Sequence, residues 1–270
     1  MANSLAYDSV DLGGASYGLT LLRTPLPRFP SPVLDIQTPA QGRGFSQGVN
    51  YDPRVMALPM GLAASSHADI QTKLDALALV LDVTADKKIQ LDQITDRYWM
   101  GRLNAPIESF RRGSVGAGFM LEFLLADRAA YSTTEEDNTF SIVSDPDTFN
   151  VESAAAVAGT DFVYPVWYIR NTTGGNITTL TLNNTTTSES LTWNATLEDN
   201  RWLKIDLTNF VISKSASTNA DATAETYSAS MGGWATGSVW PRLQPNVQNA
   251  MSVSGLSSGT ARWIYRARFK

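Results

Sequence analysis

The pentapeptide GFSQG (44–48) is the stretch of the chain whose pattern most directly suggests a reaction. It matches G-x-S-x-G, in which a serine nucleophile occupies a strained turn between a strand and a helix. Here the serine, Ser46, follows a segment rich in proline and glycine and precedes VNYDPRV, so no helix is expected after it. The single histidine, His67, lies where a predicted helix begins. We therefore expect a loop tip at Ser46 and no catalytic triad.

Residues that could bind a metal or a cofactor are sparse. The chain has no cysteine and one histidine, which excludes thiolate and multi-histidine metal sites. The glycines around Ser46 lack the spacing of a nucleotide-binding loop. Acidic residues between 135 and 147 could supply calcium ligands or the two carboxylates of a glycosidase, but the sequence does not fix their separation. A solvated linker is favoured there, and no catalytic, cofactor or metal site is predicted.

Tryptophan is concentrated in the second half of the chain, where six of the seven residues lie. An exposed tryptophan on a β-sandwich can stack on a sugar ring, so a carbohydrate-binding module for host-surface glycans is one alternative. Trp193 and Trp263 fall on apolar strand faces and are predicted to be core residues. Trp202 lies opposite such a face and Trp234 lies in the glycine-rich GGWATG, which makes these two the candidate sugar-binding residues.

The composition is that of a globular protein with a modest charge. The 270 residues allow one large or two ordinary domains, and the net charge of −5 provides no general attraction to nucleic acid. The most apolar stretch, 115–126, is short and interrupted by Glu122, and the first residues carry acids with no apolar run. We therefore expect a soluble chain without a signal peptide or membrane insertion.

A change of composition near Tyr131 predicts two domains, 1–132 and 133–270. The first contains strand-like segments and one helix over about 66–83, with Ser65 or Ser66 as its N-cap and an apolar stripe that includes Ile70, Leu74, Leu77, Val80 and Leu81. The second contains short alternating segments separated by turn residues, the pattern of a β-sandwich. Mainly β structure is expected throughout.

Three further segments attract attention. Residues 23–52 are rich in proline and glycine and are too long for a plain connection, so an extended arm or hairpin is predicted. WPRLQPNVQN (240–249) contains two prolines that predict a rigid corner before the last strands. Basic residues at Arg102, Arg111 and Arg112, and in the closing RWIYRARFK, are typical either of protected strand edges or of a subunit contact.

The order of several segments resembles the distal tail protein (Dit) family of long-tailed, siphovirus-type phages. LDQITDRYWMGRLNAPI (91–107) is similar to the family's D-R-aromatic-x-x-x-Leu strand, and FMLEFLLADRAAYS to the strand that runs into D-P-x-x-Tyr. WPRLQPNVQN resembles the family's Phe-Pro-x-Leu-x-Pro-Gly-x-Asn corner, and RWIYRARF its closing strand. Ala129, Trp240 and Asn246 replace the family's Pro, Phe and Gly, and Asn249 is displaced by one position. Asparagine tolerates a left-handed backbone, so the corner can be kept.

The resemblance implies a fold, a location and a set of partners. The fold would be an N-terminal β-sandwich or ring domain with one helix, followed by a galectin-like or CBM-like sandwich. Six copies would form a ring at the distal tail tip of the virion, between the tail tube protein and the tail-tip hub protein, around a channel through which DNA passes without specific binding. Arg97, Tyr98 and Trp99 would maintain the first domain.

The same resemblance implies a structural protein made in the host bacterial cytoplasm, with no enzymatic activity and no cofactor. A tail-tube subunit remains a further alternative. The residues proposed for the subunit interface lie in the arm and on the basic positions of the first domain: Pro27, Phe29, Arg43, Phe45, Arg97, Arg102, Arg111 and Arg112.

Overall fold

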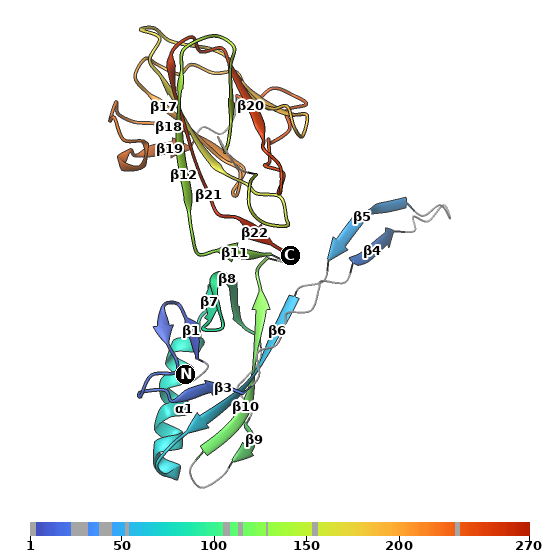
Figure 1. Cartoon of the computed structure of the whole chain (residues 1–270), viewed down its shortest axis with the longest axis vertical. Coiled ribbons are helices and arrows are strands. Elements are labelled where there is room, and N and C mark those ends of the chain that lie inside the picture. Colours follow the sequence, from blue (N-terminus) through green and yellow to red (C-terminus); the bar gives the residue numbers. More distant parts are fainter. Residues whose placement is uncertain are drawn as a thin grey trace. The chain divides into compact units, whose positions relative to one another are not determined.

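The computed structural model describes residues 4–22, 32–37, 45–51, 54–104, 109–112, 116–127, 129–152, 156–229 and 233–270. The protein is mainly β, with 49% of the described residues in strands and 8% in helix, which confirms the predicted fold class (Figure 1). Contacts between Cα atoms divide the chain into two compact units, the first of Met1–Thr133 and Lys270 and the second of Thr134–Phe269. No helix in the described part of the chain is long and apolar enough to cross a membrane.

Unit 1 contains a curled antiparallel sheet with the strand order β2-β1-β7-β8-β10-β6-β3, on which β9 pairs with β10 and β11 with β8. The bounds are β1 (Leu5–Tyr7), β2 (Val10–Asp11), β3 (Leu19–Leu21), β6 (Arg54–Ala63), β7 (Lys87–Leu91), β8 (Ile94–Leu103), β9 (Ser109–Arg112), β10 (Gly116–Leu125) and β11 (Ala130–Ser132). β6 and β10 pair along their full length, and every second residue of each is buried on one face. These two strands form the centre of the unit.

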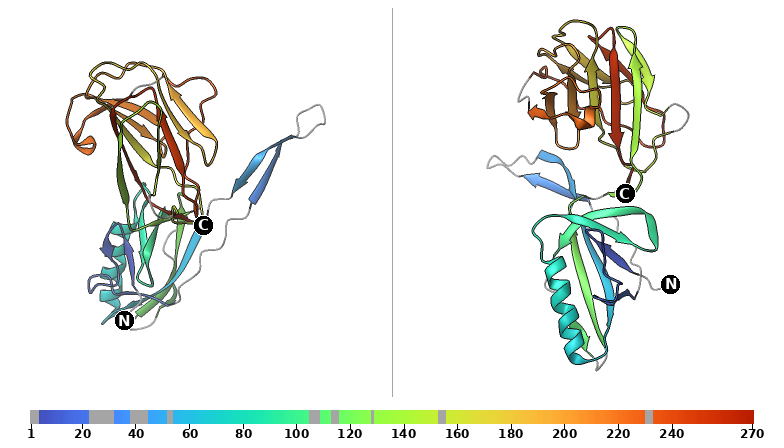
Figure 2. Two further views of the ribbon diagram at one scale, coloured as in Figure 1. Left: turned by 45° about the horizontal axis from the view of Figure 1, so that its top comes forward. Right: turned by 90° about the vertical axis from the view of Figure 1, so that its left-hand side faces the viewer.

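One helix, α1 (His67–Leu81), lies along a face of this sheet (Figure 2). The side chain of Ser66 accepts a hydrogen bond from the backbone N–H of Asp69 at 3.2 Å and caps the first turn. Ile70, Leu77 and Leu81 are buried, and they lie at the spacing expected for one face of a helix. The helix therefore follows the periodicity of its sequence, and it ends two residues before the predicted limit.

The proline-rich segment contains a hairpin of β4 (Pro32–Gln37) and β5 (Phe45–Tyr51), which form a two-stranded sheet of their own. The expected loop tip at Ser46 is wrong, because Ser46 lies inside β5 and pairs with Ile36. The next element along the chain is strand β6, so the strand-turn-helix geometry of a hydrolase elbow is not formed. The arm of unit 1 is thus built by strand pairing.

Unit 2 is built from two antiparallel sheets, with the strand orders β12-β21-β14-β17-β18-β19 and β13-β20-β15-β16. The bounds are β12 (Glu136–Ile142), β13 (Asp147–Asn150), β14 (Val166–Asn171), β15 (Leu180–Asn184), β16 (Glu189–Trp193), β17 (Trp202–Asp206), β18 (Val211–Ser215), β19 (Tyr227–Ala229), β20 (Ala250–Ser254), β21 (Gly259–Tyr265), β22 (Arg268–Phe269) and the short 3-10 helix η1 (Ala222–Ala224).

Aromatic rings fill the centre of the unit 2 core. The ring centroid of Phe149 lies 5.1 Å from that of Trp263 and 6.1 Å from that of Trp167. Trp193 and Trp263 are buried, as the alternation of their strands predicts. β21 pairs with β12 on one side and β14 on the other, so the edge-strand interpretation is wrong for residues 262–265 of the closing basic segment. Ala261, Trp263 and Tyr265 of β21 face the core, and Arg262 and Ile264 lie on the opposite face.

The proline corner closes one end of this core. Leu243 is fully buried and exchanges two backbone hydrogen bonds with Val163, of 3.0 and 2.9 Å, whereas Trp240 is only half-buried. Asn246 has a φ of 60°, which is the left-handed conformation that asparagine tolerates at a position where the family pattern has glycine. The corner keeps its turn despite this replacement.

A buried asparagine holds the corner closed. The side chain of Asn249 is fully buried, donates to the carbonyl oxygens of Gln244 at 2.9 Å and Val247 at 3.2 Å, and accepts from the Gln244 N–H at 2.8 Å. Its Oδ1 also accepts from the Nδ2 of Asn184 at 3.1 Å. The amide thereby uses both its donor and its acceptor capacity on partners of the corner and of β15.

We expect Asn249→Ala to lower the free energy of unfolding by about 3 kcal/mol, because it leaves several buried polar groups without partners. Asn194→Ala is the matched control, since the same substitution at an exposed site should change stability by less than about 0.5 kcal/mol. Urea unfolding followed by tryptophan fluorescence measures both. Equal losses in the two variants would show that the hydrogen bonds of Asn249 contribute nothing specific.

Candidate interaction surfaces

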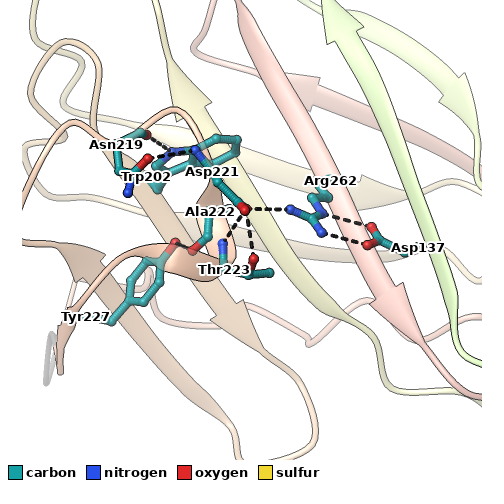
Figure 3. A network of polar contacts seen from close by, with 8 residues as sticks. All are labelled: Asp137, Trp202, Asn219, Asp221, Ala222, Thr223, Tyr227 and Arg262. Carbon is teal, nitrogen blue, oxygen red and sulfur yellow. Dashed lines mark hydrogen bonds and ion pairs between the residues drawn. The ribbon is translucent and has the colours of Figure 1, made fainter.

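The outer face of the six-stranded sheet in unit 2 is covered by the chain's own residues 216–226 (Figure 3). Trp202, Tyr168 and Ala222 form a second buried cluster on this face. The indole Nε1 of Trp202 donates to the Asn219 carbonyl oxygen at 2.8 Å, and only 3% of the residue is exposed. The prediction that Trp202 offers a sugar-stacking surface is therefore wrong, because this loop lies over the ring that the strand pattern places outside the core.

Arg262 links this loop to the sheet through hydrogen bonds and ion pairs, which we call the Arg262 clasp. Its guanidinium donates to both carboxylate oxygens of Asp137, at 2.8 and 2.6 Å, and to Oδ1 of Asp221 at 2.9 Å (Figure 3). Hydrogen bonding to Asp137 raises the pKa of Arg262, and the N–H of Thr223 lowers the pKa of Asp221. Asp137 lies in β12, so the solvated linker predicted for this acidic stretch is wrong there. Among the described residues no group of side chains could hold a metal ion.

The clasp predicts a local effect of removing Asp221. In Asp221→Ala the loop loses both the bond to Arg262 and the cap of η1, so we expect residues 216–226 to exchange amide hydrogens at least about tenfold faster. Hydrogen exchange read by mass spectrometry measures this directly. Asp75→Ala on the exposed face of α1 serves as the control, and unchanged exchange in 216–226 would show that the clasp does not hold the loop.

A second ion pair lies beside the proline corner. Arg242 donates from its side chain to Oε1 of Glu189 at 2.8 and 2.6 Å, and from its backbone N–H to Oε2 at 2.8 Å. Burial alone would raise the pKa of Glu189, but these hydrogen bonds outweigh it and hold the pKa below its usual range. Glu189 begins β16, so the pair ties the corner to the edge of the four-stranded sheet.

The lowered pKa of Glu189 gives a stability that depends on pH. A carboxyl with a depressed folded pKa stabilises the protein above its unfolded value, about 4.3, and loses this effect as the pH falls through the folded pKa. We expect Glu189→Gln to cost about 2 kcal/mol at pH 7, and the difference from the unsubstituted protein to shrink below about pH 4. Thermal unfolding between pH 3 and 7 measures it, and a difference independent of pH would contradict the ionised pair.

The basic positions proposed for the subunit interface do not gather in one place. Both Arg97 and Arg102 lie in β8. Arg97 is half-buried and contacts Asp96 at 3.1 Å, and Arg102 is exposed and lies 3.8 Å from Asp86. β8 pairs with residues 123–125 of β10, whereas β9, which contains Arg111 and Arg112, pairs with residues 117–119. Phe45 lies in β5 opposite Gln37, and Pro27, Phe29 and Arg43 lie outside the described residues.

Two tyrosines of unit 1, Tyr98 and Tyr131, form a contact that the sequence alone did not reveal. Tyr98 in β8 stacks on Tyr131 in β11 with ring centroids 5.7 Å apart, and the ammonium of Lys88 lies 4.8 Å from the Tyr98 ring. The Tyr131 hydroxyl donates to Oδ2 of Asp127 at 2.6 Å. Trp99, the next residue of β8, is buried. These contacts join β11 to the main sheet.

Sequence reasoning also missed an exposed group of aromatic rings in unit 2. Trp234, one of the predicted sugar-binding residues, is 48% exposed, and its ring lies 6.1 Å from that of Trp240. The ring centroid of Trp240 in turn lies 5.5 Å from that of Phe210, and Phe210 is 54% exposed. The three residues come from separate segments, so their proximity has no signal in the linear sequence.

Comparison with known proteins found a solved structure that matches the whole chain. No family model and no curated protein sequence matches the chain. The crystal structure of the Dit protein (gp 19.1) of phage SPP1 superposes with a TM-score of 0.71 over 100% of both chains. The chain has the fold of SPP1 Dit. The two sequences are 13% identical, so the Dit fold is what this likeness establishes.

SPP1 Dit is described as a paradigm of the hub adsorption apparatus in phages that infect Gram-positive bacteria. Two structures of the activated phage P2 baseplate, one with calcium and one with strontium, match at 8% identity with TM-scores of 0.43 and 0.44. Those TM-scores are too low to support an argument. The match to the Dit fold covers both units of the chain, the unit with the helix and the unit whose described elements are strands and the short η1.

Proposed function

We propose that the chain is a structural protein of a phage tail, a distal tail protein that joins the tail tube to the tail-tip hub. The observation that carries this proposal is the structural match to SPP1 Dit, which has a TM-score of 0.71 and covers 100% of both chains. The order of sequence segments supports it independently, since the helix, the D-R-Tyr strand and the proline corner follow one another as in that family. The role assigned is assembly, without an enzymatic reaction.

The assembly is a homohexameric ring around the DNA channel at the distal tail tip. Unit 1 corresponds to the ring-forming domain, 1–132, and unit 2 to the outer domain, 133–270. Residues 23–52 contact the neighbouring subunit, together with the basic positions of β8 and β9. The net charge of −5 suits a channel through which DNA passes without being held by phosphate contacts. A ring of this kind has heterologous interfaces that close by rotation.

The mass of the purified protein in solution tests the ring. Six copies of the 29.3 kDa chain give about 176 kDa, which light scattering behind a sizing column distinguishes from a monomer. We expect this mass or twice it, the latter for two stacked rings. A monomer at every concentration would contradict a self-assembling ring, and open-ended tubes would identify a tail-tube subunit instead.

The arm provides a variant that separates assembly from folding. β4 and β5 form their own sheet, so deletion of residues 42–48 breaks no strand pairing of the larger sheet. We expect the deleted protein to melt within about 3 °C of the full chain and to elute mainly as a smaller species on the same column. If it forms hexamers as the full chain does, the arm is not the subunit contact.

A further inference from the structure

Four aromatic residues form a continuous row on unit 2, which we call the aromatic surface: Tyr164, Phe210, Trp240 and Trp234. Neighbouring ring centroids along the row are 6.5, 5.5 and 6.1 Å apart. Val211 and Val239, 40% and 50% exposed, adjoin it in the sequence. Four of the five large apolar residues that are exposed in the described part of unit 2 thus belong to this row or flank it.

Phe210 is presented on a rigid turn between β17 and β18. The carboxylate of Asp206 accepts hydrogen bonds from the backbone N–H groups of Thr208 and Asn209, at 3.1 and 3.0 Å. Phe210 itself has a φ of 53°, a left-handed conformation that glycine or asparagine adopts far more readily than a bulky residue. A turn optimised for stability alone would carry glycine here. A strained aromatic residue with an exposed ring indicates selection for a contact.

The backbone on both sides of Trp234 is also held in place by hydrogen bonds. Its segment runs along the edge of β16, where Asn194 N–H donates to the Gly233 carbonyl, Ala235 N–H to Thr192 at 2.8 Å, and Val239 N–H to Ser190 at 2.7 Å. The backbone on both sides of Trp234 is therefore fixed by the sheet. Because this backbone is already ordered, less conformational entropy of the protein is lost when a ligand binds to the ring.

The size and charge of the aromatic surface restrict its ligand. Aromatic side chains bury about 150–250 Å² each, so the exposed fractions here leave a few hundred Å² of apolar area. A stable protein interface needs roughly 800 Å² per partner, which this surface does not reach. Two cations adjoin Tyr164, and both are paired with carboxylates. Arg242 donates hydrogen bonds to Glu189, and the guanidinium of Arg268, 5.1 Å from the Tyr164 ring centroid, lies 4.0 Å from the carboxylate of Asp161. A small, neutral ligand with both apolar faces and hydroxyl groups fits these properties.

We propose that the aromatic surface binds neutral carbohydrate, with pyranose rings stacked on Trp234 and Phe210 and hydroxyl groups directed to Tyr164 and the Arg242–Glu189 pair. The C–H faces of a pyranose provide the flat apolar contact that an exposed indole or phenyl ring accepts. The polar pair at one end of the row provides donors and acceptors for the ring hydroxyls. The site replaces the pair Trp202 and Trp234 expected from the sequence, and it does not depend on the proposed ring.

The test uses the full chain on an array of neutral oligosaccharides, followed by affinity gel electrophoresis in the corresponding polysaccharide, for example α-glucan, β-glucan, galactan or mannan. We expect retardation of the unsubstituted protein by at least one of them, and a loss of affinity of at least about tenfold in Trp234→Ala and in Phe210→Gly. Trp234→Phe should retain part of the binding. Phe210→Gly relieves the left-handed strain and should melt within about 3 °C of the unsubstituted protein, so its loss of binding cannot be assigned to unfolding.

Val143→Ala is the matched control, because Val143 is 78% exposed on the same unit and lies outside the aromatic surface. It should bind as the unsubstituted protein does. A silent array with no retardation in any polysaccharide overturns the proposal, and so does retardation that survives both substitutions. Loss of the oligomer in Trp234→Ala without any sugar binding would also overturn it and would make the surface a protein contact.

Discussion

Two buried asparagines, Asn184 and Asn249, hold together the part of unit 2 on which its other features depend. Asn184 donates to Oδ1 of Asn249 and to the Arg242 carbonyl at 2.5 Å, and its own Oδ1 accepts from the Thr186 N–H at 3.0 Å. A buried amide that lost these partners would carry an unmet cost of desolvation. These hydrogen bonds join the β15–β16 turn to the proline corner, in the segments that also contain Glu189, Arg242 and Leu243.

Other contacts determine which surfaces of unit 2 are covered and which are open. The inner faces of the two sheets share an aromatic core, and residues 216–226 cover the outer face through Trp202 and the Arg262 clasp. The stretch from Trp234 to Trp240 runs from the edge of β16 into the corner, where the half-buried Trp240 lies between Phe210 and the exposed Trp234. The proposed carbohydrate site is thus formed by residues of unit 2 alone.

Local pattern predicted much of this fold, and long-range contact decided the rest. The helix, the β-rich second half, the arm hairpin and the left-handed Asn246 follow from periodicity, proline content and backbone preference, which are properties of neighbouring residues. Trp202 was assigned to the wrong environment because its partner, Asn219, lies 17 residues away on a loop. Asn184 stands in the polar run NNTTT (183–187), yet it is buried and bonded to a partner 65 residues distant. The aromatic surface joins segments that no periodicity connects.

The central claim is that copies of this chain close into a ring around a channel, and images of single particles test it most directly. Electron cryo-microscopy of the purified protein should give end-on class averages with six-fold symmetry and an open centre wide enough for duplex DNA. Averages that show a particle without a channel, or a rotational order other than six, would contradict the account.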